Sequence, residues 1–404
     1  MKKILYFVPT FSNLSETFIL REIESLVQRE KLDVHVVSLK QGKAKLPDCL
    51  IYKVTYIQPS FVDLFHVAGF IFKNLIQVYK VLIKFFKESD DSYKSKIRNF
   101  SKGILYAYKL SYFNCDQVHI HFLSDISTII SISCLINKKP FSISGHAKDI
   151  FVDSSSINFK VKNSRFVTVC NSKAFLKCIE LSGGKGRKNL IMSFHGVDHS
   201  KYQYKERKFN STDQLNILTD ARFTEKKGLI PLSQAVITFI KEYNFDVNLT
   251  IVGLANTDEQ FQHLEDVKKL FKSAHVYQRL SIPGNGAGIQ QDDVIEIYKN
   301  SDIFIYAGKD ASTGDVDGVP NGLLQAAYSG VPVITTLAGS ISDLFNDKNS
   351  YIINQGSSED IIEKFNFLIL DKMRLSKSEK LKKDVSENFD LVKNITYLEN
   401  QLLK

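Results

Sequence analysis

The residues with the clearest chemical pattern lie in one run in the last third of the chain. The run reads GDVDGVPNGLLQAA over positions 314–327 and is followed by SGVPV. It joins an acidic side chain, Asp317, to a Gly-Val-Pro turn and a stretch of helical character. Glycine and proline shape a loop whose free amides, with the N-terminus of the following helix, can face a phosphate group. The pattern predicts a site for a phosphorylated ligand. An ordinary loop-helix-strand connection in an α/β domain can have a similar sequence.

Two cations follow an expected strand earlier in the same half of the chain. Arg222 and Lys227 lie in the run LTDARFTEKKG. An arginine guanidinium can fork onto two phosphate oxygens, and a lysine adds a point charge. Such groups stabilise the negative charge that grows on a diphosphate leaving group as its bond breaks. Taken alone, an arginine and a lysine after a strand are ordinary surface residues, so this interpretation depends on the run near Asp317.

A histidine ends an expected strand in the first half of the chain. His146 lies in the run FSISGHAKDI. Ligands of open α/β sheets bind at the carboxyl ends of the strands, and an imidazole can donate and accept hydrogen bonds near neutral pH. We therefore expect His146 at a binding edge. His119 and His121 alternate in the strand-like run VHIHF, and we interpret one of them as structural.

The N-terminal run SNLSETFI contains Ser15, Glu16 and Thr17. Small polar and acidic residues in this arrangement are typical of a helix N-terminus, where they satisfy free amides. The same side chains can contact a ligand, and both roles can hold together.

These runs together resemble the signature of the retaining glycosyltransferases of family 4, which have the GT-B fold. The run at 314–327 is similar to the family's donor site, but Asp317 and Gln325 stand where the family usually has glutamate. The run at Arg222 is similar to its Gly-Arg…Lys-Gly segment, with Ala221 in place of the glycine. His146 lies in a segment similar to His-Ala-x-Asp-Ile. The N-terminal run resembles a Ser-Glu-Thr-Phe loop found in enzymes of surface-polysaccharide assembly.

The resemblance implies a role for each candidate residue. Arg222 and Lys227 would clamp the donor diphosphate. His146 and Asp317 would hold the donor sugar, and Gln325 would contact the ribose. The other donor-binding positions would be Gly318, Val319, Pro320, Asn321, Gly322 and Leu323. The acceptor-binding positions would be Ser15, Glu16 and Thr17.

The activity implied by the resemblance is transfer of a sugar, with retention at the anomeric carbon, from a UDP- or GDP-linked donor to a hydroxyl of a glycan or lipid-linked acceptor. The expected setting is polysaccharide, capsule or lipopolysaccharide assembly. No cofactor and no metal are expected. The run DVD at 315–317 has the form of an Asp-x-Asp metal motif, but two carboxylates without further oxygen ligands make a weak magnesium site. The replacements at Asp317 and Gln325 leave weaker donor binding, a shifted donor preference and loss of activity open, and the alternative function is a weak or inactive partner subunit that binds sugar nucleotides.

The elements that must position these residues alternate along the whole chain. β-rich runs followed by helical stretches predict parallel, doubly wound sheets. The pattern restarts after the charged segment 201–213, so we expect two Rossmann-like domains of the GT-B type facing a cleft. Residues 1–205 would bind the acceptor and 206–385 the nucleotide sugar, and a helix in 386–404 would return to the first domain. GxGxxG after a strand and GxxxxGK[ST] are both missing, which disfavours dinucleotide and P-loop enzymes.

Composition excludes several other classes of protein. The chain has 404 residues, 44% of them hydrophobic and 24% charged, which suits two ordinary domains and excludes a small stapled module or a disordered chain. Its five cysteines form no CxxC pair, so we expect a reducing compartment and no structural zinc.

The charge distribution points to an anionic partner for the first half. Residues 1–200 carry 29 lysines and arginines against 16 acidic residues. Because the chain also carries the donor signature, nucleic acid is the least favoured of the anionic partners. An anionic membrane surface is still a candidate partner. The apolar segment 61–86 is interrupted by charges, so it does not predict a membrane span. It fits both an amphipathic membrane contact and buried helices with snorkelling lysines. We expect a cytoplasmic protein. If the segment 61–86 contacts a membrane, the protein would be peripheral on the inner face of the cell membrane.

Overall fold

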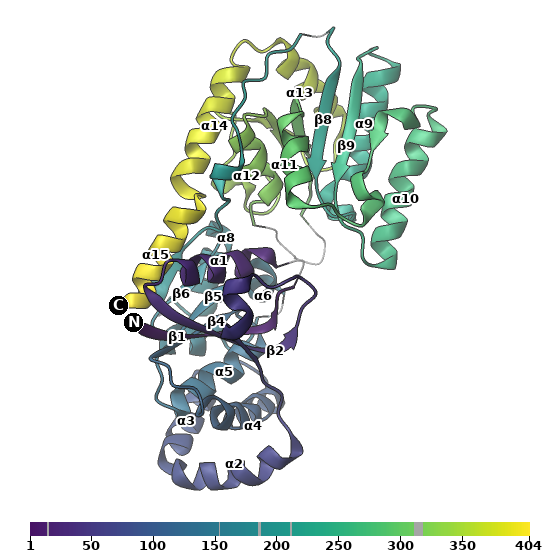
Figure 1. The fold of residues 1–404 in the computed structure, drawn as a ribbon. Coiled ribbons are helices and arrows are strands. Elements are labelled where there is room, and N and C mark those ends of the chain that lie inside the picture. The colour runs from purple at the N-terminus through teal and green to yellow at the C-terminus, as the bar shows by residue number, and fades with distance from the viewer. Residues whose placement is uncertain (14–15, 153, 185–186, 211, 311–317) are drawn as a thin grey trace. The chain divides into compact units, whose positions relative to one another are not determined.

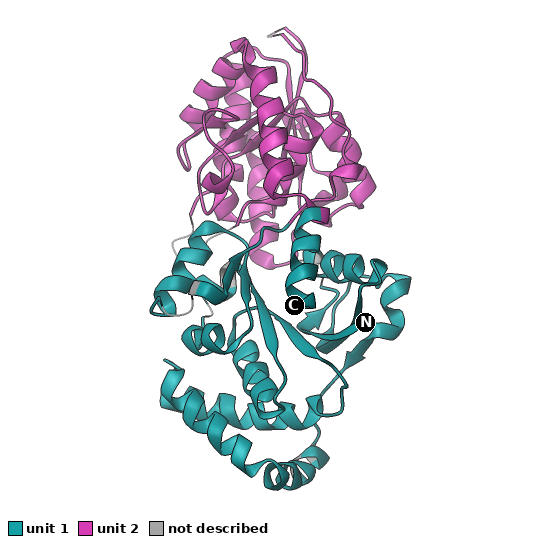
Figure 2. Ribbon diagram, turned by 90° about the vertical axis from the view of Figure 1, so that its left-hand side faces the viewer, with its two compact units in different colours: residues 1–195, 393–404 teal, residues 196–392 magenta. Residues whose placement is uncertain are grey.

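The computed structural model describes residues 1–404 apart from 14–15, 153, 185–186, 211 and 311–317. The chain divides into two compact units (Figure 2). Unit 1 contains Met1–His195 together with Lys393–Lys404, and unit 2 contains Gly196–Val392. The charged segment 201–213 therefore lies inside unit 2, and the end of the last helix belongs to unit 1.

Unit 1 is built on a seven-stranded parallel sheet (Figure 1). In spatial order its strands are β3 (Val54–Tyr56), β2 (Leu32–Gln41), β1 (Lys2–Phe11), β4 (Gln117–His121), β5 (Phe141–Gly145), β6 (Val167–Val169) and β7 (Leu190–Met192). The strand order reverses between β1 and β4, so the carboxyl ends of these two strands flank a topological switch point, where α/β sheets bind ligands. His121 ends β4, and His146 directly follows β5.

The two faces of this sheet differ in polarity. Strand residues such as Phe7, Ile120 and Ile143 pack with side chains of the helices into one buried cluster. Alternate residues of a strand point to opposite faces. The alternate positions carry buried polar side chains: Tyr6, His119, His121, Ser142, Ser144 and Thr168. The helices of unit 1 are α1 (Thr17–Gln28), α2 (Phe61–Lys73), α3 (Leu75–Glu88), α4 (Tyr93–Leu110), α5 (Asp125–Ile136), α6 (Ala147–Phe151), α7 (Ile157–Asn163), α8 (Ser172–Leu181) and most of α15 (Leu391–Leu403).

Helix α15 is fastened to unit 1 by charged side chains. Lys2 donates a hydrogen bond from Nζ to the carbonyl of Leu402 at 2.7 Å. The buried carboxylate of Glu399 accepts from Arg29 at 3.3 Å and from Lys31 at 3.1 Å. A buried carboxylate needs such partners because burial without them is costly. The C-terminal helix therefore completes unit 1.

Helices α2 and α3 form an outer layer of unit 1 beside α4 and α5. Apolar residues of α3, among them Val81 and Phe85, meet Phe100 of α4 and Ile132 of α5 in a separate buried cluster. Within the described residues, no helix has both the length and the apolar composition that crossing a bilayer requires.

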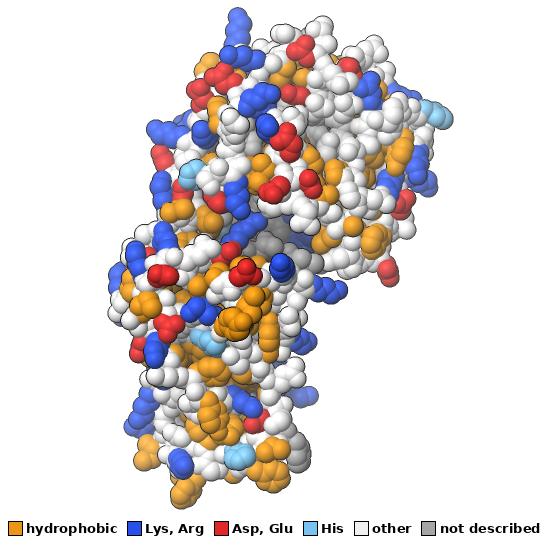
Figure 3. All heavy atoms as spheres, in the orientation of Figure 1, with side chains coloured by type: hydrophobic (Ala, Val, Ile, Leu, Met, Phe, Trp, Pro, Cys, Tyr) orange, Lys and Arg blue, Asp and Glu red, His pale blue; other side chains and the backbone are white. Residues whose placement is uncertain are grey.

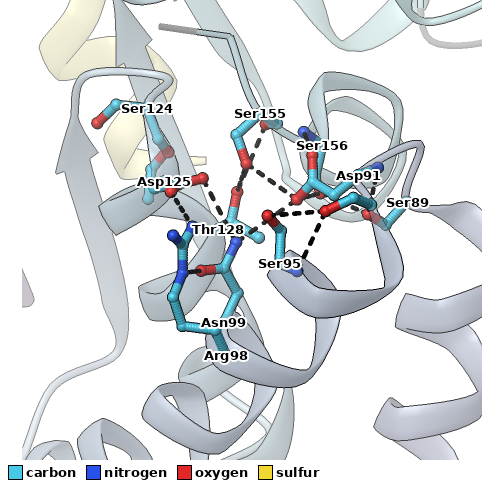
Figure 4. Close-up of polar contacts among 12 residues, drawn as sticks. Ser89, Asp91, Ser95, Arg98, Asn99, Ser124, Asp125, Thr128, Ser155 and Ser156 are labelled. Carbon is cyan, nitrogen blue, oxygen red and sulfur yellow. Dashed lines mark hydrogen bonds and ion pairs between the residues drawn. The ribbon is translucent and has the colours of Figure 1, made fainter.

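A carboxylate ties this outer layer to the rest of unit 1 (Figure 4). Asp91, between α3 and α4, accepts from Ser156 Oγ at 2.7 Å and from the Ser156 amide at 3.0 Å, and also from Ser155 Oγ at 3.0 Å. Ser156 has a left-handed backbone, φ 47°, at the start of α7. Since a serine adopts this conformation only at a cost, the bonds to Asp91 hold the turn in place.

Unit 2 repeats the architecture with six parallel strands. Their order is β10 (Leu280–Ser281), β9 (Val247–Val252), β8 (Leu215–Asp220), β11 (Ile303–Tyr306), β12 (Val333–Thr335) and β13 (Tyr351–Ile352). The helices are α9 (Leu229–Lys241), α10 (Asp258–Ser273), α11 (Gln291–Lys299), α12 (Asn321–Ser329), α13 (Ser358–Leu370) and α14 (Arg374–Asn388). Here the switch point lies between β8 and β11. Both units have the parallel, doubly wound architecture predicted from the sequence.

Candidate functional site

The first group of candidate residues in unit 2 lies on the loop that leaves β8. Arg222 is exposed on this loop, while its neighbours Ala221 and Phe223 are buried and anchor the chain. Lys227 ends a short 3-10 turn and is buried, with its Nζ donating to the Tyr306 hydroxyl at 3.1 Å. Tyr306 is the last residue of β11. The two cations expected from the sequence thus lie beside the switch point of the sheet.

Gly228 explains why this turn can reach β11. Its φ is 67°, and a Cβ atom added there would lie 1.8 Å from the carbonyl oxygen of Ala307. Only glycine fits this combination of left-handed backbone and close approach. The Lys-Gly pair therefore places Lys227 against β11 by letting the backbone of the turn touch the strand end.

A buried carboxylate joins β8 to the helix of the donor run. The Tyr298 hydroxyl lies 3.2 Å from Asp220 Oδ2 and 3.2 Å from the carbonyl oxygen of Gly322, so its single proton can serve either acceptor. Burial raises the pKa of Asp220 to about 6, although Tyr298 and Lys227 oppose the shift. A Cβ at Gly322 would lie 3.0 Å from Asp220. The first turn of α12 is therefore held directly against the end of β8. Sequence reasoning missed Asp220, whose signal was its place as the last residue of an expected strand.

Helix α12 carries the other donor-binding candidates. Gly318, Val319 and Pro320 precede it and are half-buried, and Asn321 begins it with an exposed side chain. Leu323, also expected to contact the donor, is fully buried. Asp317, expected to hold the sugar, lies outside the described residues.

Gln325 lies one turn into α12, where the sequence placed a ribose contact. Its side chain is 6% exposed, and its Oε1 is buried without a hydrogen-bond partner among the described residues. The same holds for Thr224 Oγ1 on the loop between Arg222 and Lys227. Buried polar atoms are normally hydrogen-bonded, so each unsatisfied group needs an explanation, and a bound ligand is one.

In unit 1 His146 is positioned through its main chain. The carboxylate of Asp149 accepts from the His146 amide at 2.9 Å and also from the amide of Leu123, which follows β4. Burial raises the pKa of Asp149 to about 6, against the effect of these amide bonds. Asp149 is the aspartate of the His-Ala-x-Asp-Ile segment, and the structure shows that it orders the ends of two neighbouring strands. Sequence reasoning assigned no role to Asp149.

The imidazole of His146 contacts two further histidines. Its Nε2 lies 3.3 Å from His121 Nδ1, and its Nδ1 lies 3.0 Å from His195 Nε2. Burial and the neighbouring imidazoles hold the pKa of His146 well below its usual value, and burial lowers that of His195 to about 4. His146 is therefore neutral near pH 7, with both ring nitrogens occupied. His195 was missed, although it follows an expected strand just as His146 does.

The two histidines of β4 differ in their partners. His119 contacts the hydroxyls of Ser142 at 2.7 Å and Ser144 at 2.9 Å, and burial lowers its pKa to about 3. His121 instead faces Glu22 of α1, with Nε2 3.2 Å from Oε1. Of the pair, His119 thus fits the structural role expected for one of them.

The N-terminal candidates lie beside the same histidines. Glu16 is the residue before α1, but its side chain makes no capping hydrogen bond. Burial raises the pKa of Glu16, and a hydrogen bond with Asn13 and the nearby His121 partly offset the rise. Thr17 begins α1, and Ser15 lies outside the described residues. The Glu16 side chain therefore does not cap α1 and instead forms a hydrogen bond with Asn13.

Two groups of side chains in unit 1 have ligand types that suit a metal ion. One is His146, Cys170 and His195, and the other is Glu22, His119 and His121; in each group the ligating atoms lie within 4.8 Å of one another. Both ring nitrogens of His119 and His146, and Nε2 of His195, already meet the partners described above. We assign no ion to either group.

The fold and the two edges define the class of this protein. Two Rossmann-like units, each with polar residues at the carboxyl ends of its strands, form a GT-B protein. Over its whole length the chain is similar to the crystal structure of Anabaena HepE in complex with UDP and glucose, with a TM-score of 0.68 and 15% identity, covering 100% of both chains. At this identity the likeness shows the fold.

The sequence comparisons give the family. Residues 201–388 match the family model described as glycosyl transferases group 1. A colanic acid biosynthesis glycosyltransferase of Escherichia coli K12 is 27% identical over 191 residues, which is 45% of this chain and 42% of that protein. The capsular polysaccharide biosynthesis glycosyltransferase CapM of Staphylococcus aureus is 23% identical over 48% of this chain and 50% of its own length. The chain thus aligns with about half or less of these relatives. Residues 201–388 therefore match the group 1 glycosyltransferases, and the chain is related to bacterial transferases of capsule and colanic acid biosynthesis, which confirms the resemblance found in its motifs.

Proposed function

We propose that the chain transfers a sugar, with retention at the anomeric carbon, from a nucleoside-diphosphate donor to a hydroxyl of a surface-polysaccharide acceptor. The observation that carries the proposal is the arrangement at the switch point of unit 2. There the loop with Arg222 and Lys227 and the first turn of α12 both lie at the end of β8. Two cations and a helix N-terminus at one sheet edge suit a diphosphate.

The proposed chemistry uses these groups to stabilise the leaving group. As the bond between the anomeric carbon and the diphosphate breaks, negative charge grows on the phosphate oxygens. Exposed Arg222 can reach these oxygens from the loop, and Lys227 adds a charge held in place by Tyr306. In the family's picture the departing diphosphate takes the proton of the acceptor hydroxyl, which attacks the face that the leaving group vacates. His146 and Asp317 would hold the sugar.

We propose a uridine nucleotide as the donor. HepE, whose fold this chain shares, binds UDP and glucose, and the fold is the link between the two proteins. The buried and unpartnered Oε1 of Gln325 can accept a hydrogen bond from a ribose hydroxyl one turn inside α12. The glutamine lacks the charge of the family's usual glutamate, so we expect a weaker ribose contact than a carboxylate would make.

For the acceptor we propose a lipid-linked glycan at an anionic membrane. The outer helices of unit 1 expose apolar side chains that burial in a core would have covered: Phe72 is 83% exposed, Ile76 74% and Phe65 72%. The neighbouring Lys73, Lys80, Lys84 and Lys87 are exposed too. Figure 3 shows hydrophobic and basic side chains together at the lower end of the view, where Figure 1 places α2 and α3. An exposed apolar face ringed by lysines suits an anionic lipid surface.

The membrane part has its own test. We expect the wild-type chain to sediment with vesicles that contain phosphatidylglycerol and less with neutral vesicles. The double variant Phe72→Asp with Ile76→Asp should lose most of this binding. Phe367→Asp is the matched control, because Phe367 is 57% exposed but lies in unit 2. Equal binding by all three proteins would rule out α2 and α3 as the contact.

The transfer itself is tested by nucleoside-diphosphate release. Purified protein is incubated with UDP- and GDP-sugars and a membrane extract, and release is followed with and without the extract. Arg222→Ala and Lys227→Ala should each reduce turnover at least tenfold, since each removes a charged contact to the leaving group. Lys241→Ala, at the far end of α9, is the matched control and should leave turnover unchanged. Undiminished turnover in Arg222→Ala would refute its role as a clamp.

A second candidate function is that of a partner subunit that binds sugar nucleotides without turnover. Gln325 favours it, because the position usually occupied by glutamate carries a neutral side chain here. Measurable UDP binding together with no release from any donor would support this alternative.

A further inference from the structure

The loops that follow β1 and β2, at the carboxyl edge of the unit 1 sheet, are bonded to each other. The two strands are neighbours (Figure 1), and their backbone ladder continues past the strand ends. The Gly42 amide donates to the Phe11 carbonyl at 2.7 Å, and the Ala44 amide donates to the Ser12 carbonyl at 2.8 Å. A Cβ atom at Gly42 would lie 2.3 Å from the Ser12 carbonyl oxygen, so only glycine allows this close approach. The loop after β2 is therefore fixed against Ser12.

Ser12 has two unfavourable features. Its φ is 66°, a left-handed conformation that serine adopts at a cost in free energy. Its side chain is 3% exposed, and Oγ has no hydrogen-bond partner among the described residues. A buried hydroxyl without a partner is also costly. Glycine at this position would avoid both costs, so the hydroxyl is the one group that serine adds here. Strained residues with unsatisfied groups are found at ligand sites, where the ligand supplies the missing partner.

Three lysines accompany Ser12 at this edge. Lys40 is the last residue but one of β2, Lys43 and Lys45 lie on the loop after it, and all three are exposed. None of the ion pairs formed among the described residues involves them. By contrast, Lys31 directly precedes β2 at the other edge of the sheet and pairs with Glu399 at 3.1 Å. The uncompensated positive charge of these two strands therefore lies at the carboxyl edge.

These groups suit an anion with several oxygens. A lysine ammonium binds phosphate as a point charge, and a serine hydroxyl can donate to a phosphate oxygen. Helix α1 begins at Thr17, shortly after Ser12, and its positive N-terminal end lies at the same edge. Ligands of parallel α/β sheets bind at this edge. The acceptor proposed above is a lipid-linked glycan, in which a phosphate commonly joins the glycan to its lipid.

We propose that Lys40, Lys43 and Lys45, together with the Ser12 hydroxyl, bind a phosphate group of the acceptor. The proposal rests on the proposed transfer reaction, because that reaction supplies the acceptor. It places an anion site beside Glu16 and Thr17, the acceptor candidates that follow on the loop after β1.

The anion site can be tested without turnover. The full-length protein is first given excess UDP to fill the donor site, and the rate at which acetic anhydride modifies each lysine is measured by mass spectrometry. Inorganic pyrophosphate should slow the modification of Lys40, Lys43 and Lys45 several-fold, whereas sodium chloride at the same ionic strength should not. Lys138 is the matched control, because it is exposed and lies between α5 and β5 at the opposite edge. Equal rates with and without pyrophosphate at all four lysines would overturn the inference.

Kinetics test the link to the acceptor. The triple variant Lys40→Ala, Lys43→Ala and Lys45→Ala should need at least tenfold more membrane extract for half-maximal release of nucleoside diphosphate, because charged contacts to the acceptor are lost. The donor KM should stay unchanged. The control is a variant with the same loss of charge on exposed lysines of unit 2: Lys241→Ala, Lys269→Ala and Lys372→Ala. An unchanged need for extract, or a rise in the donor KM instead, would contradict the assignment to the acceptor.

Ser12 has a test that separates binding from folding. Ser12→Gly relieves the left-handed strain, so it should unfold at the same temperature as the wild type or higher. It should nevertheless need about tenfold more extract, the usual size of one lost hydrogen bond to a charged group. Lys138→Gly, at φ 54° in the same unit, is the matched control and should leave the need for extract unchanged. A less stable Ser12→Gly with an unaltered need for extract would show that Ser12 is only structural.

The source of the phosphate is decided with vesicles. The triple lysine variant should sediment with phosphatidylglycerol vesicles as well as the wild type does. Loss of this binding would assign the lysines to lipid headgroups and overturn the acceptor role. If the wild-type protein releases no nucleoside diphosphate from any donor, the transfer proposal fails, and the acetylation experiment still decides whether the loops bind phosphate. If release is normal and pyrophosphate protects no lysine, the anion site alone fails.

Discussion

Replacing Gly228 with alanine should destabilise unit 2 far more than a glycine-to-alanine change at another left-handed position. A non-glycine residue at φ 67° costs about 1–2 kcal/mol. In addition, the new Cβ would lie 1.8 Å from the Ala307 carbonyl oxygen, whereas ordinary contacts begin near 3.4 Å. The turn and the end of β11 must therefore move apart, and such overpacking costs about 1–3 kcal/mol. Alanine also restricts the unfolded chain, which returns about 0.4–1 kcal/mol. The expected loss is about 3 kcal/mol.

Gly356→Ala is the matched control for this change. Gly356 lies in the same unit at φ 77°, and nothing lies within 4 Å of an added Cβ. The expected loss is then only the backbone term less the unfolded-state gain, about 1 kcal/mol or less. The chain has no tryptophan, so far-UV circular dichroism and calorimetry are the suitable probes of unfolding.

The same pair of variants tests the link to the site. Because Lys227 precedes Gly228 and is held against β11, its displacement in Gly228→Ala should raise the donor KM at temperatures where the variant is folded. Gly356→Ala should leave the donor KM unchanged. Equal losses of stability in both variants would refute the steric argument, and an unaltered donor KM in folded Gly228→Ala would refute the role given to the turn.

Three further predictions concern unit 1, metal ions and the donor. Unit 1 should lose stability as the pH falls from about 6.5 to 5. His119 and His195 stay neutral in the folded protein but bind protons when it unfolds, which costs about 2 kcal/mol each. Asp149 has a raised pKa of about 6 in the folded protein, so its protonation offsets this loss by about 1.4 kcal/mol. Urea unfolding at both pH values measures this, and equal stability would contradict it. EDTA should leave nucleoside-diphosphate release unchanged; a loss restored by Mg²⁺ or Zn²⁺ would show a metal requirement. Gln325→Ala should raise the donor KM several-fold through the lost ribose contact, and an unchanged value would remove Gln325 from the donor site.

The candidate positions that the sequence indicated share one property. His146, Arg222 and Lys227 follow expected strands, and in a parallel sheet the carboxyl ends of all strands lie at one edge. Local periodicity was therefore enough to place each residue at an edge. Local periodicity does not give the spatial order of the strands. It therefore could not predict that the turn with Lys227 meets β11 rather than another strand. That contact depends on Gly228 and Ala307, which are 79 positions apart.

The amphipathic segment 61–86 shows a second limit. Buried helices and a surface contact both fit its letters, because periodicity shows that a helix has an apolar face but not what covers it. In the structure one part of the segment is buried and another is exposed. Val81 and Phe85 of α3 are buried against α4 and α5, whereas Phe72 and Ile76 are exposed. Whether the apolar face of a helix is buried depends on the elements packed against it, and these lie far away in the sequence.

The polar face of the unit 1 sheet explains why His195 and Glu22 were the hardest residues to find. A buried strand face is ordinarily apolar, and each buried polar group costs about 1–3 kcal/mol unless a partner satisfies it. At β4 and β5 the polar residues face one another: His119 contacts two serine hydroxyls, and His121 lies against Glu22 and His146. None of these pairings is local in sequence, so each residue read singly resembles an ordinary core or loop position. A sheet face that carries hydrogen-bonded polar side chains is little more stable than the same face packed with leucines. What leucines cannot supply is a set of hydrogen-bonding groups at the carboxyl edge of the sheet, where ligands of α/β sheets bind.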